Sequence, residues 1–320
     1  MKAVLALLMG LTPVCAYPAE STFPERPIRI VVPFPPGGGS DFVARVLALK
    51  LPELFGQNVV VDNRAGAASL LGTQLVANAP NDGYTLLLAD TPFAVNQEIY
   101  SKPGYDPLRS FSPITQLATT PMLLVVNPSV PAATLQEFIA LAKAQPGKLR
   151  ISNGGIGTIA QLAGVLLMIN AGIELTPVQY KGGGPSLIGL MAGETQANIA
   201  PAPVAMPHIK TGKVRPLGVS SAKRSPFAPD VPTMLEGGVK GYAVGNWYIL
   251  VAPAHTPAGI IARLHAACVK VLAQRDTVER LAAALIEVAP SSSPRELHDM
   301  IASEMKNWTR VVKEAGIRLE

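Results

Sequence analysis

The stretch from Ile28 to Leu49 constrains the fold most, because it sets a strand, a glycine turn and a helix in direct succession. Residues 28–34 are apolar and β-branched, as in a strand buried on both faces. Pro35-Pro36 ends the strand and three glycines follow. Apolar residues then recur at helical spacing, with Ser40 or Asp41 expected as the N-cap. Such a turn presents unpaired N–H groups at the positive end of a helix, which predicts an anion site, although glycines that only permit a sharp turn would look the same.

The chain is long enough for two domains that each bury a core. Of its 320 residues, 48% are hydrophobic and 15% are charged, which is typical of a compact globular protein and not of a disordered one. The formal net charge of +5 comes from scattered lysines and arginines without a basic run. This pattern gives no support for nucleic-acid binding, but it would modestly attract small anions.

Residues 1–16 are predicted to be a secretory signal peptide of minimal length. Lys2 precedes an apolar run at 3–11, and cleavage is expected after Ala16 or Ala19. An apolar run of this length is too short for a membrane anchor. Lipidation at Cys15 is an alternative that the preceding Thr12-Pro13-Val14 disfavours. We therefore expect a soluble, exported mature chain in which Cys268 is a buried thiol without a disulfide.

Two successive sets of alternating strands and helices follow, which predicts an α/β fold with parallel strands and right-handed crossovers. In the first set, Thr91 is expected to cap a helix with Pro92 in its first turn, and residues 101–120 are expected to be irregular. The further strands of this set are expected at 59–61 and 84–89, and its other helix at 67–79. The second set is expected to have strands at 122–126, 149–152, 175–180, 196–200 and 215–219, with helices at 135–144, 158–171, 185–192 and 202–211.

The chain then returns to the first set. Residues 221–246 are loop-rich, and a strand at 248–252 precedes helices at 258–273, 276–285 and 294–315. This helical tail has no strands of its own to cover, so we expect it to pack on the first sheet. The predicted domains are therefore 22–120 together with 246–320, and 121–245. Two crossings, near Thr120 and Gly245, would form a hinge.

Five loops are expected at the ligand-binding edge of these sheets, where strands end and helices begin. They are residues 35–41, 63–69, 90–94, 152–158 and 182–186. Backbone N–H groups and the hydroxyls of Ser40, Thr91, Ser152 and Thr158 would hold a carboxylate there. Arg64 and Lys181 are the nearest cations, and either could instead be a solvated loop charge. Trp247 and Tyr248 could line the cleft, although core packing is favoured.

The search for catalytic groups is negative. His208, His255, His265 and His298 are far apart and lack partners at metal-ligand spacing. Ser40-Asp41 lacks the nucleophile-elbow pattern, and the glycine loop lacks the P-loop lysine and the dinucleotide fingerprint. We therefore expect no catalytic residue, no metal and no cofactor, although a triad assembled in space stays an alternative.

The sequence resembles the tripartite tricarboxylate transporter substrate-binding family, the Bug or TctC-like receptors. The segments that carry the resemblance run in order along nearly the whole mature chain. They are PERPIRIVVPFPPGGGSDFVAR, GQNVVVDNRAGAASLLG, NDGYTLLLA, PGYDPLRSFSPI, PMLLVVNP, ISNGGIGTIAQLAG, VQYKGGGPSLIGLMAGE, MPHIKTGKVRPLGVSSAKR, PDVPTMLEGG and VAPAHTPAGI.

The resemblance implies a two-lobed periplasmic-binding-protein fold, a type II-like Venus flytrap with two Rossmann-like domains. It also implies a monomer in the periplasm that closes on a small carboxylate and delivers it to the permease subunits of a tripartite transporter. Together, the loops and the resemblance give the following candidate ligand-binding residues: Pro36, Gly37, Gly38, Gly39, Ser40, Asp41, Arg64, Thr91, Ser152, Asn153, Gly154, Gly157, Thr158, Gly182 and Gly183.

The chain also departs from its family's pattern. Gln161 stands where relatives often have His, and Ala200-Pro201 stands where they often have an acidic or amide pair. The loss of that acidic group favours a plain or aromatic carboxylate over an amino acid. Asp90 beside Thr91 is unusual and would repel a second carboxylate if it faced the cleft. A sensory receptor and a periplasmic hydrolase or transferase are the alternative functions.

Overall fold

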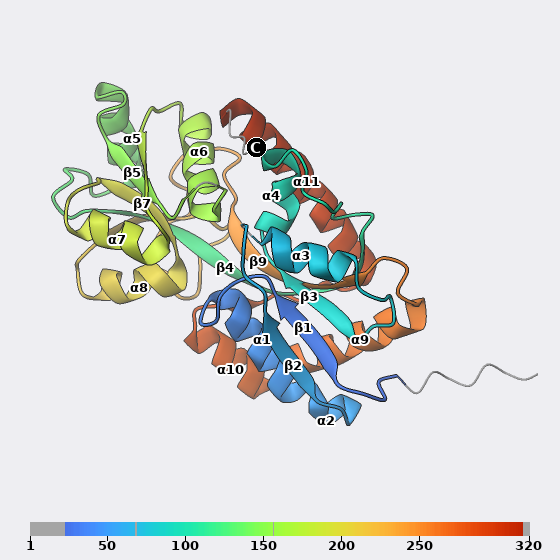
Figure 1. The fold of residues 1–320 in the computed structure, drawn as a ribbon. Helices are drawn as coiled ribbons and strands as arrows, with labels where there is room; N and C mark the ends of the chain where they lie inside the picture. The colour runs from blue at the N-terminus through green and yellow to red at the C-terminus, as the bar shows by residue number, and fades with distance from the viewer. Residues whose placement is uncertain (1–22, 68, 156, 316–320) are drawn as a thin grey trace, which may run out of the picture.

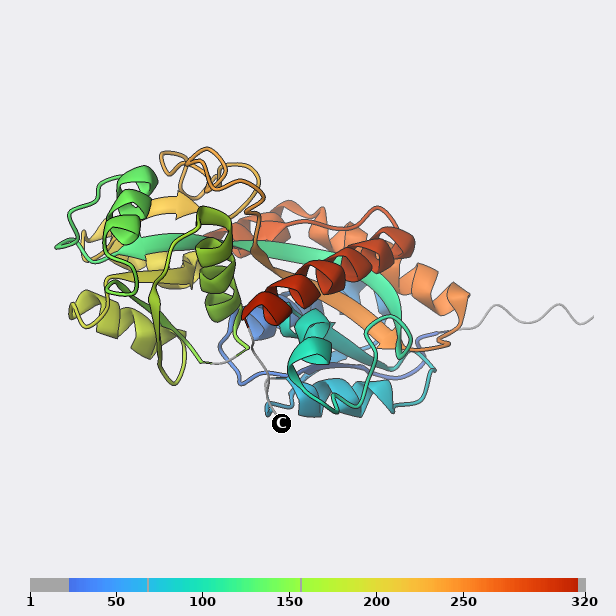
Figure 2. The ribbon, with the colours of Figure 1, turned by 90° about the horizontal axis from the view of Figure 1, so that it is seen from above.

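The computed structural model describes residues 23–67, 69–155 and 157–315, which form two lobes side by side (Figure 1). The expected signal peptide and Cys15 lie outside these residues. One long strand, β4, runs through both lobes (Figure 2). The α/β fold predicted from the alternating pattern is confirmed, but the expectation of parallel strands holds for only part of the sheet, because the long strand and its neighbours pair antiparallel.

The first lobe is built on a sheet with the strand order β2-β1-β3-β9-β4. The strands β1, β2 and β3 are mutually parallel, and β9 is antiparallel to both β3 and β4. The strands are β1 (Ile28–Val32), β2 (Val59–Asn63), β3 (Thr85–Ala89), β4 (Phe111–Val126), β9 (Gly245–Pro253) and β10 (Glu287–Val288), which pairs with β4. Every residue of β1 except Arg29 is buried, as its apolar sequence predicts for a strand inside the sheet.

The second lobe continues from β4 in the order β4-β7-β5-β6, and β8 also pairs with β4. Its strands are β5 (Arg150–Asn153), β6 (Thr176–Gln179), β7 (Ala197–Pro201) and β8 (Arg215–Val219). On β4, pairing passes from β9 to β7 between Pro121 and Met122. On the returning segment, β9 begins at Gly245. Both positions coincide with the two predicted crossings, while the domain boundaries themselves stay a prediction.

Helices cover the faces of the two sheets (Figure 1). Those of the first lobe are α1 (Gly39–Lys50), α2 (Pro52–Phe55), α3 (Leu70–Ala77), α4 (Pro92–Ile99), α9 (Ala258–Leu272), α10 (Arg275–Ala283) and α11 (Pro294–Ala315). Those of the second are α5 (Leu135–Ala144), α6 (Ile159–Ala171), α7 (Gly183–Met191) and α8 (Ala202–Lys210). None of the helices in the described ranges has the length and apolarity needed to cross a bilayer.

Two expectations about secondary structure were wrong. Residues 111–120 form the first part of β4 instead of an irregular segment, because the ladder with β9 shifts register after Pro113 and so accommodates that proline. The C-terminal tail is not purely helical, since Glu287 and Val288 pair with Thr119 and Ala118.

The helix α11 joins the two lobes and does not pack only on the first sheet. Leu297 and Ile301, near its start, belong to a core cluster of the first lobe. Trp308, Val311 and Val312, near its end, belong to the main core cluster of the second. Figure 2 shows the helix running obliquely from one lobe to the other. Any motion of the lobes must therefore be absorbed at this helix as well as at β4 and β9.

Candidate functional site

A cavity of about 1050 Å³ lies between the lobes. The first lobe contributes the turn after β1, the end of β3, the start of β9 and the segment after α10. The second contributes the starts of α7 and α8. The lining residues are Phe34, Pro35, Pro36, Gly37, Gly38, Gly39, Ser40, Phe42, Asp90, Gly183, Gly184, Pro185, Pro201, Pro203, Val204, Asn246, Tyr248, Ala284 and Ile286.

The glycine turn after β1 supplies hydrogen-bond donors to this cavity. Gly38 is the N-cap of α1 and no side chain caps the helix, so the expected capping by Ser40 or Asp41 was wrong. Within the described residues, the N–H groups of Gly38, Gly39 and Ser40 have no hydrogen-bond partner. Three unpaired donors at a helix N-terminus favour an anion at this position.

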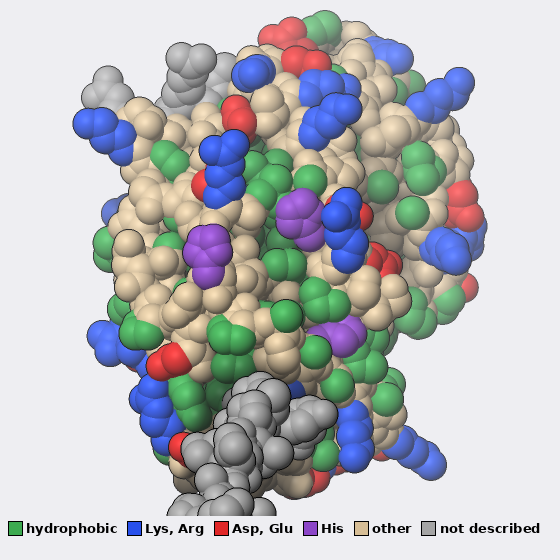
Figure 3. All heavy atoms as spheres, turned by 90° about the vertical axis from the view of Figure 1, so that its right-hand side faces the viewer, with side chains coloured by type: hydrophobic (Ala, Val, Ile, Leu, Met, Phe, Trp, Pro, Cys, Tyr) green, Lys and Arg blue, Asp and Glu red, His purple; other side chains and the backbone are tan. Residues whose placement is uncertain are grey.

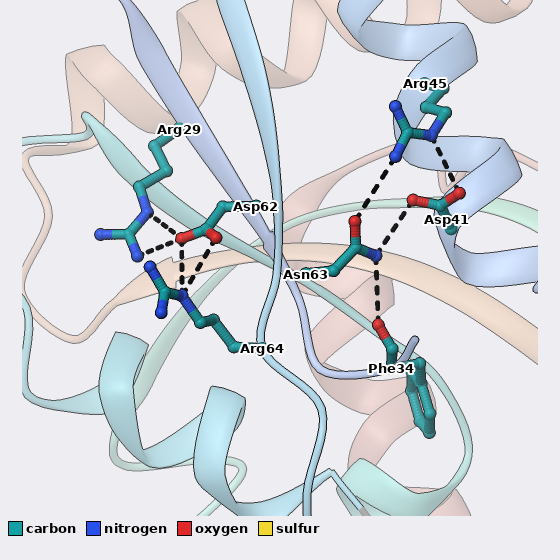
Figure 4. Close-up of polar contacts among 7 residues, drawn as sticks. All are labelled: Arg29, Phe34, Asp41, Arg45, Asp62, Asn63 and Arg64. Carbon is teal, nitrogen blue, oxygen red and sulfur yellow. Dashed lines mark hydrogen bonds and ion pairs between the residues drawn. The ribbon is translucent and has the colours of Figure 1, made fainter. Parts of the chain in front are cut away.

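The Asp41 side chain holds this turn from behind (Figure 4). Its Oδ2 accepts hydrogen bonds from the Gly37 N–H and from Arg45 Nε, both at 2.9 Å. Asn63 Nδ2 donates to Asp41 Oδ1 at 3.0 Å and to the Phe34 carbonyl at 3.1 Å. Burial raises the pKa of Asp41, but the bonds from Arg45, Gly37 and Asn63 outweigh it and leave the pKa below its usual value.

A cluster of polar side chains from three elements forms the first-lobe wall beside the turn. Ser40 Oγ donates to Asp90 Oδ2 at 3.0 Å, and Thr91 Oγ1 donates to Asn246 Oδ1 at 3.0 Å. The Asn246 NH₂ group is left as a donor, and this amide lowers the pKa of the neighbouring Asp90 carboxyl group. Tyr248 lies so close to Gly39 that a Cβ at that glycine would meet the Tyr248 hydroxyl. The turn, β3 and β9 therefore meet at one polar surface.

Among the described residues, Asp90 is the one carboxyl group that lines the cavity. It is 8% exposed, and its Oδ1 is buried without a hydrogen-bond partner among the described residues. Burial raises the pKa of Asp90 to about 7, against smaller opposing effects of the Ser40 hydroxyl and the Asn246 amide. This carboxyl group therefore keeps its proton to a higher pH than an exposed aspartate does.

The second-lobe wall consists of glycine and proline, with Val204. The helix α7 begins at Gly183, and the N–H groups of Gly183 and Gly184 have no partner in the described part of the chain. The loop 152–158 supports this turn from behind, since Gly182 N–H donates to the Gly154 carbonyl at 3.1 Å. A Cβ at Gly154 would lie 3.0 Å from the Gly182 carbonyl carbon.

Most polar groups of the loop 152–158 are bonded inside the second lobe. The Gly155 N–H donates to Asn153 Oδ1 at 2.9 Å, and the Gly157 N–H donates to Gln161 Oε1 at 2.7 Å. The Thr158 side chain caps α6, and Ser152 Oγ donates to the Ser186 carbonyl at 3.0 Å. This loop therefore has few free donors in this conformation.

The two cations that the sequence places nearest the ligand-binding loops do not line the cavity between the lobes. Arg64 donates to Asp62, which also binds Arg29, and these three residues line a separate hollow beside β2 (Figure 4). Lys181 is exposed and does not line the cavity. The pocket is thus equipped for an anion by backbone amides instead of by arginine or lysine.

The predicted site residues fall into two groups. Those that line the cavity are Pro36, Gly37, Gly38, Gly39, Ser40 and Gly183. Those that do not are Asp41, Arg64, Thr91, Ser152, Asn153, Gly154, Gly157, Thr158 and Gly182. Contact with a ligand stays a prediction for all of them.

Sequence reasoning omitted several lining residues from the predicted site. No sequence pattern pointed to Asn246, and core packing was the favoured role for Tyr248. Asp90 was considered only as a group that would repel a second carboxylate of the ligand. The order of strands β3-β9 is what brings these three to the glycine turn, and this order cannot be read from local patterns.

The described residues contain no group of three or more His, Cys, Asp or Glu that could hold a metal ion. Figure 3 shows histidines standing apart from one another on one face, with acidic and basic side chains interspersed around them. A second hollow, lined in part by His265, Arg295 and His298, lies against α9 and α11, away from the cavity between the lobes.

The arrangement of two α/β lobes around a cavity defines a periplasmic-binding-protein fold, and comparison with known proteins agrees. The model of the tripartite tricarboxylate transporter family receptor, TctC, matches residues 43–317. The chain is 39% identical to a UPF0065 protein from the tcbD-tcbE intergenic region of Pseudomonas sp. strain P51, over 91% of this chain and 87% of that protein. It is 35% identical to BugT of Bordetella pertussis, over 100% of this chain and 98% of that protein. The chain belongs to the TctC receptor family, which consists of substrate-binding proteins and not of enzymes.

Solved structures give the same result. Rpa4515 of R. palustris with adipate has a TM-score of 0.82 and 33% identity, over 93% of this chain and 100% of that one. The periplasmic binding protein BugD has a TM-score of 0.79 and 34% identity, with the same coverage. MatC of Rhodopseudomonas palustris with bound malate has a TM-score of 0.76 and 32% identity, over 91% of this chain and 100% of that one. The predicted two-lobed binding-protein fold is thereby confirmed.

Proposed function

We propose that this protein is a periplasmic receptor that captures a small carboxylate between its lobes and presents it to a membrane permease. One observation carries the proposal: unpaired N–H groups of Gly38, Gly39 and Ser40 in one lobe, and of Gly183 and Gly184 in the other, border the same cavity. Hydrogen bonds to a charged acceptor are each worth about 1.5–3 kcal/mol, so a few of them hold a carboxylate firmly.

Capture requires that the lobes close, and two strand connections suit a hinge. The lobes 22–120 with 246–320, and 121–245, would rotate about Pro121–Met122 and Gly245. A ligand drives such a closure only through its higher affinity for the closed state. The closed form would then be the surface that the permease subunits recognise, with the receptor acting as a monomer.

The lining also restricts the rest of the ligand. Phe34, Phe42, Pro203, Val204 and Ile286 give the cavity an apolar component, and Pro201 offers no acidic group to an amine. A plain aliphatic or aromatic carboxylate fits this lining better than an amino acid. Relatives of known structure carry adipate and malate, which makes these two acids the first to test.

The test is a thermal-shift and calorimetric screen of acetate, benzoate, malate, adipate and aspartate. Adipamide is the matched control, since it keeps the chain of adipate and loses both charges. We expect at least one acid to raise the melting temperature, because a hundredfold excess over Kd adds about 2.7 kcal/mol to the free energy of unfolding. Adipamide should have no effect. Equal binding of adipamide, or no binding of any acid, contradicts the proposal. Capture of a kinase ectodomain instead of permease subunits by the loaded receptor would show a sensory role.

A further inference from the structure

Asp90 presents a physical conflict in the proposed site, because a carboxyl group lines a cavity built to hold an anion. Its Oδ2 is hydrogen-bonded to Ser40, whose own N–H is one of the free donors of the glycine turn. A carboxylate held by that turn therefore lies next to Asp90. When two carboxylates share a site without a cation between them, the pKa of one of them is strongly raised.

The described residues supply no such cation. The titratable side chains on β9 and on the segment after α4 that interact with Asp90 are Tyr248 and Tyr105, and burial raises the pKa of each, so both are neutral. On α1, the Asp41 carboxylate and Arg45 are paired with each other.

The remaining charged groups on neighbouring elements are also engaged. On β1, Arg29 is bound to Asp62, and on α4, Glu98 accepts a hydrogen bond from Thr309. The helix α3 has no charged residue. No cation in the described structure therefore compensates a negative charge on Asp90, and the neutral donors Ser40 and Asn246 only partly offset the cost of burying that charge.

The hydrogen bonding of Asp90 points the same way. An ionised carboxylate shares its charge between two oxygens, and each needs donors when it is buried. Here Oδ2 accepts a hydrogen bond from the Ser40 hydroxyl, whereas Oδ1 is buried and has no hydrogen-bond partner in the described ranges. A proton on Asp90 removes this unfavourable charge, and it also removes the repulsion toward an incoming anion.

We propose that Asp90 is neutral in the loaded receptor, so that binding of a carboxylate at the Gly37–Ser40 turn is coupled to uptake of one proton by Asp90. The coupling rests on the proposed function and deepens it: Asp90 selects for acids without an amine and makes their capture dependent on pH. The proton passes from solvent to the Asp90 carboxylate, and no bond of the ligand is broken.

The test is calorimetric titration of malate, adipate, benzoate and acetate in two buffers of different ionisation enthalpy. From the raised pKa of free Asp90, we expect each acid that binds to take up close to one proton at about pH 8, and much less at about pH 6. Affinity should fall about tenfold for each pH unit above 7. In Asp90→Asn, we expect binding to persist with no proton uptake and no pH dependence. The control Asp230→Asn removes one exposed carboxylate and should behave as wild type.

The outcomes distinguish the proposed proton coupling from the proposed receptor function on which it rests. Binding without proton uptake at about pH 8 overturns the coupling and leaves the receptor function standing. Tighter binding of aspartate than of malate also overturns it, since Asp90 would then be an ionised acceptor for an amine. Absence of binding by every acid overturns both. If Asp90→Asn folds but binds nothing, infrared difference spectra of the wild type at about pH 8 decide: a protonated-carboxyl band that grows on binding supports the coupling, and its absence refutes it.

Discussion

The two walls of the cavity differ in the groups that they present to a ligand. The first-lobe wall carries polar side chains, namely Ser40, Asp90, Asn246 and Tyr248, around a turn with free amides. The second-lobe wall carries glycines, prolines and Val204, and the loop behind it has bonded its own donors. The difference indicates that the first lobe recognises charge and protonation, whereas the second supplies two further amides and a close-fitting surface. The following experiments test this asymmetry.

Substitution of the buried acid should give the largest effect. The Asp90 pKa is about 7 in the folded protein and near 3.8 when unfolded. Between these values the unfolded chain has lost the proton that the folded protein keeps, so wild-type stability falls as pH rises from about 4 to about 7 and is level above it. Asp90→Asn has no carboxyl group at this position, so its stability does not fall in this way. The free energy of unfolding of the variant should exceed that of the wild type by an amount that grows from near zero at about pH 4 to at most about 4 kcal/mol at about pH 8.

Denaturant unfolding at several pH values measures this difference, and Asp230→Asn is again the control. A constant difference between wild type and Asp90→Asn across this range would mean that Asp90 is ionised in the free protein. The first-lobe wall would then carry a negative charge that its neighbours stabilise. Protonation of Asp90 would not explain how this wall differs from the second-lobe wall.

A side chain placed in the glycine turn should weaken binding next most strongly. Gly38 has an ordinary φ of −83°, and a Cβ there meets nothing within 4 Å, so Gly38→Val should fold normally. Its branches would obstruct the approach of a carboxylate to the turn's amides, and we expect more than tenfold weaker binding by calorimetry. Gly259→Val is the matched control, because Gly259 is also open but lies on α9, away from the cavity. Unchanged affinity in Gly38→Val would remove the turn from the site.

Loss of the Asp41 side chain tests whether the first wall is held in place from behind. Asp41→Ala leaves the Gly37 N–H without its acceptor and removes one of the two acceptors of the Asn63 amide, which should cost about 1–3 kcal/mol of stability and weaken binding about threefold to tenfold. Asp41→Asn keeps an acceptor oxygen and should recover part of the affinity. Because the Asp41 pKa is lowered, its contribution to stability is present above about pH 4 and is lost as pH falls through the folded value.

A positioning role and direct contact with the ligand give different results for Asp41. If both variants lose affinity equally while their stabilities differ, Asp41 contacts the ligand, as the sequence predicts. If affinity follows stability through the series, its part is to position the turn.

Local patterns predicted much of the fold and the first-lobe turn, because those features are encoded in consecutive residues. The helix Leu135–Ala144 and the strand Arg215–Val219 have the predicted bounds. The first part of β4 was missed because Pro113 and Pro121 disfavour a strand, and only pairing with β9 overrides them. Asn246 and Tyr248 reach the cavity through the same distant pairing, so no local pattern could place them there. Asp90 could be recognised as unusual, but its burial depends on the assembled sheet.

The loop 152–158 is where the sequence and the geometry differ most, and it should show the smallest effect. The resemblance places this loop at the ligand, yet its amides are bonded to Asn153 and Gln161 and it does not line the cavity. Gln161→Ala frees the Gly157 N–H without adding bulk. If the loop only supports the Gly182–Gly184 turn, affinity should change less than about twofold, since the lost bond is worth about 0.5–1.5 kcal/mol of stability and not of binding. A gain or loss of tenfold in Kd would show that closure brings this loop to the ligand. The second wall would then also recognise charge, and the asymmetry would belong to this conformation alone.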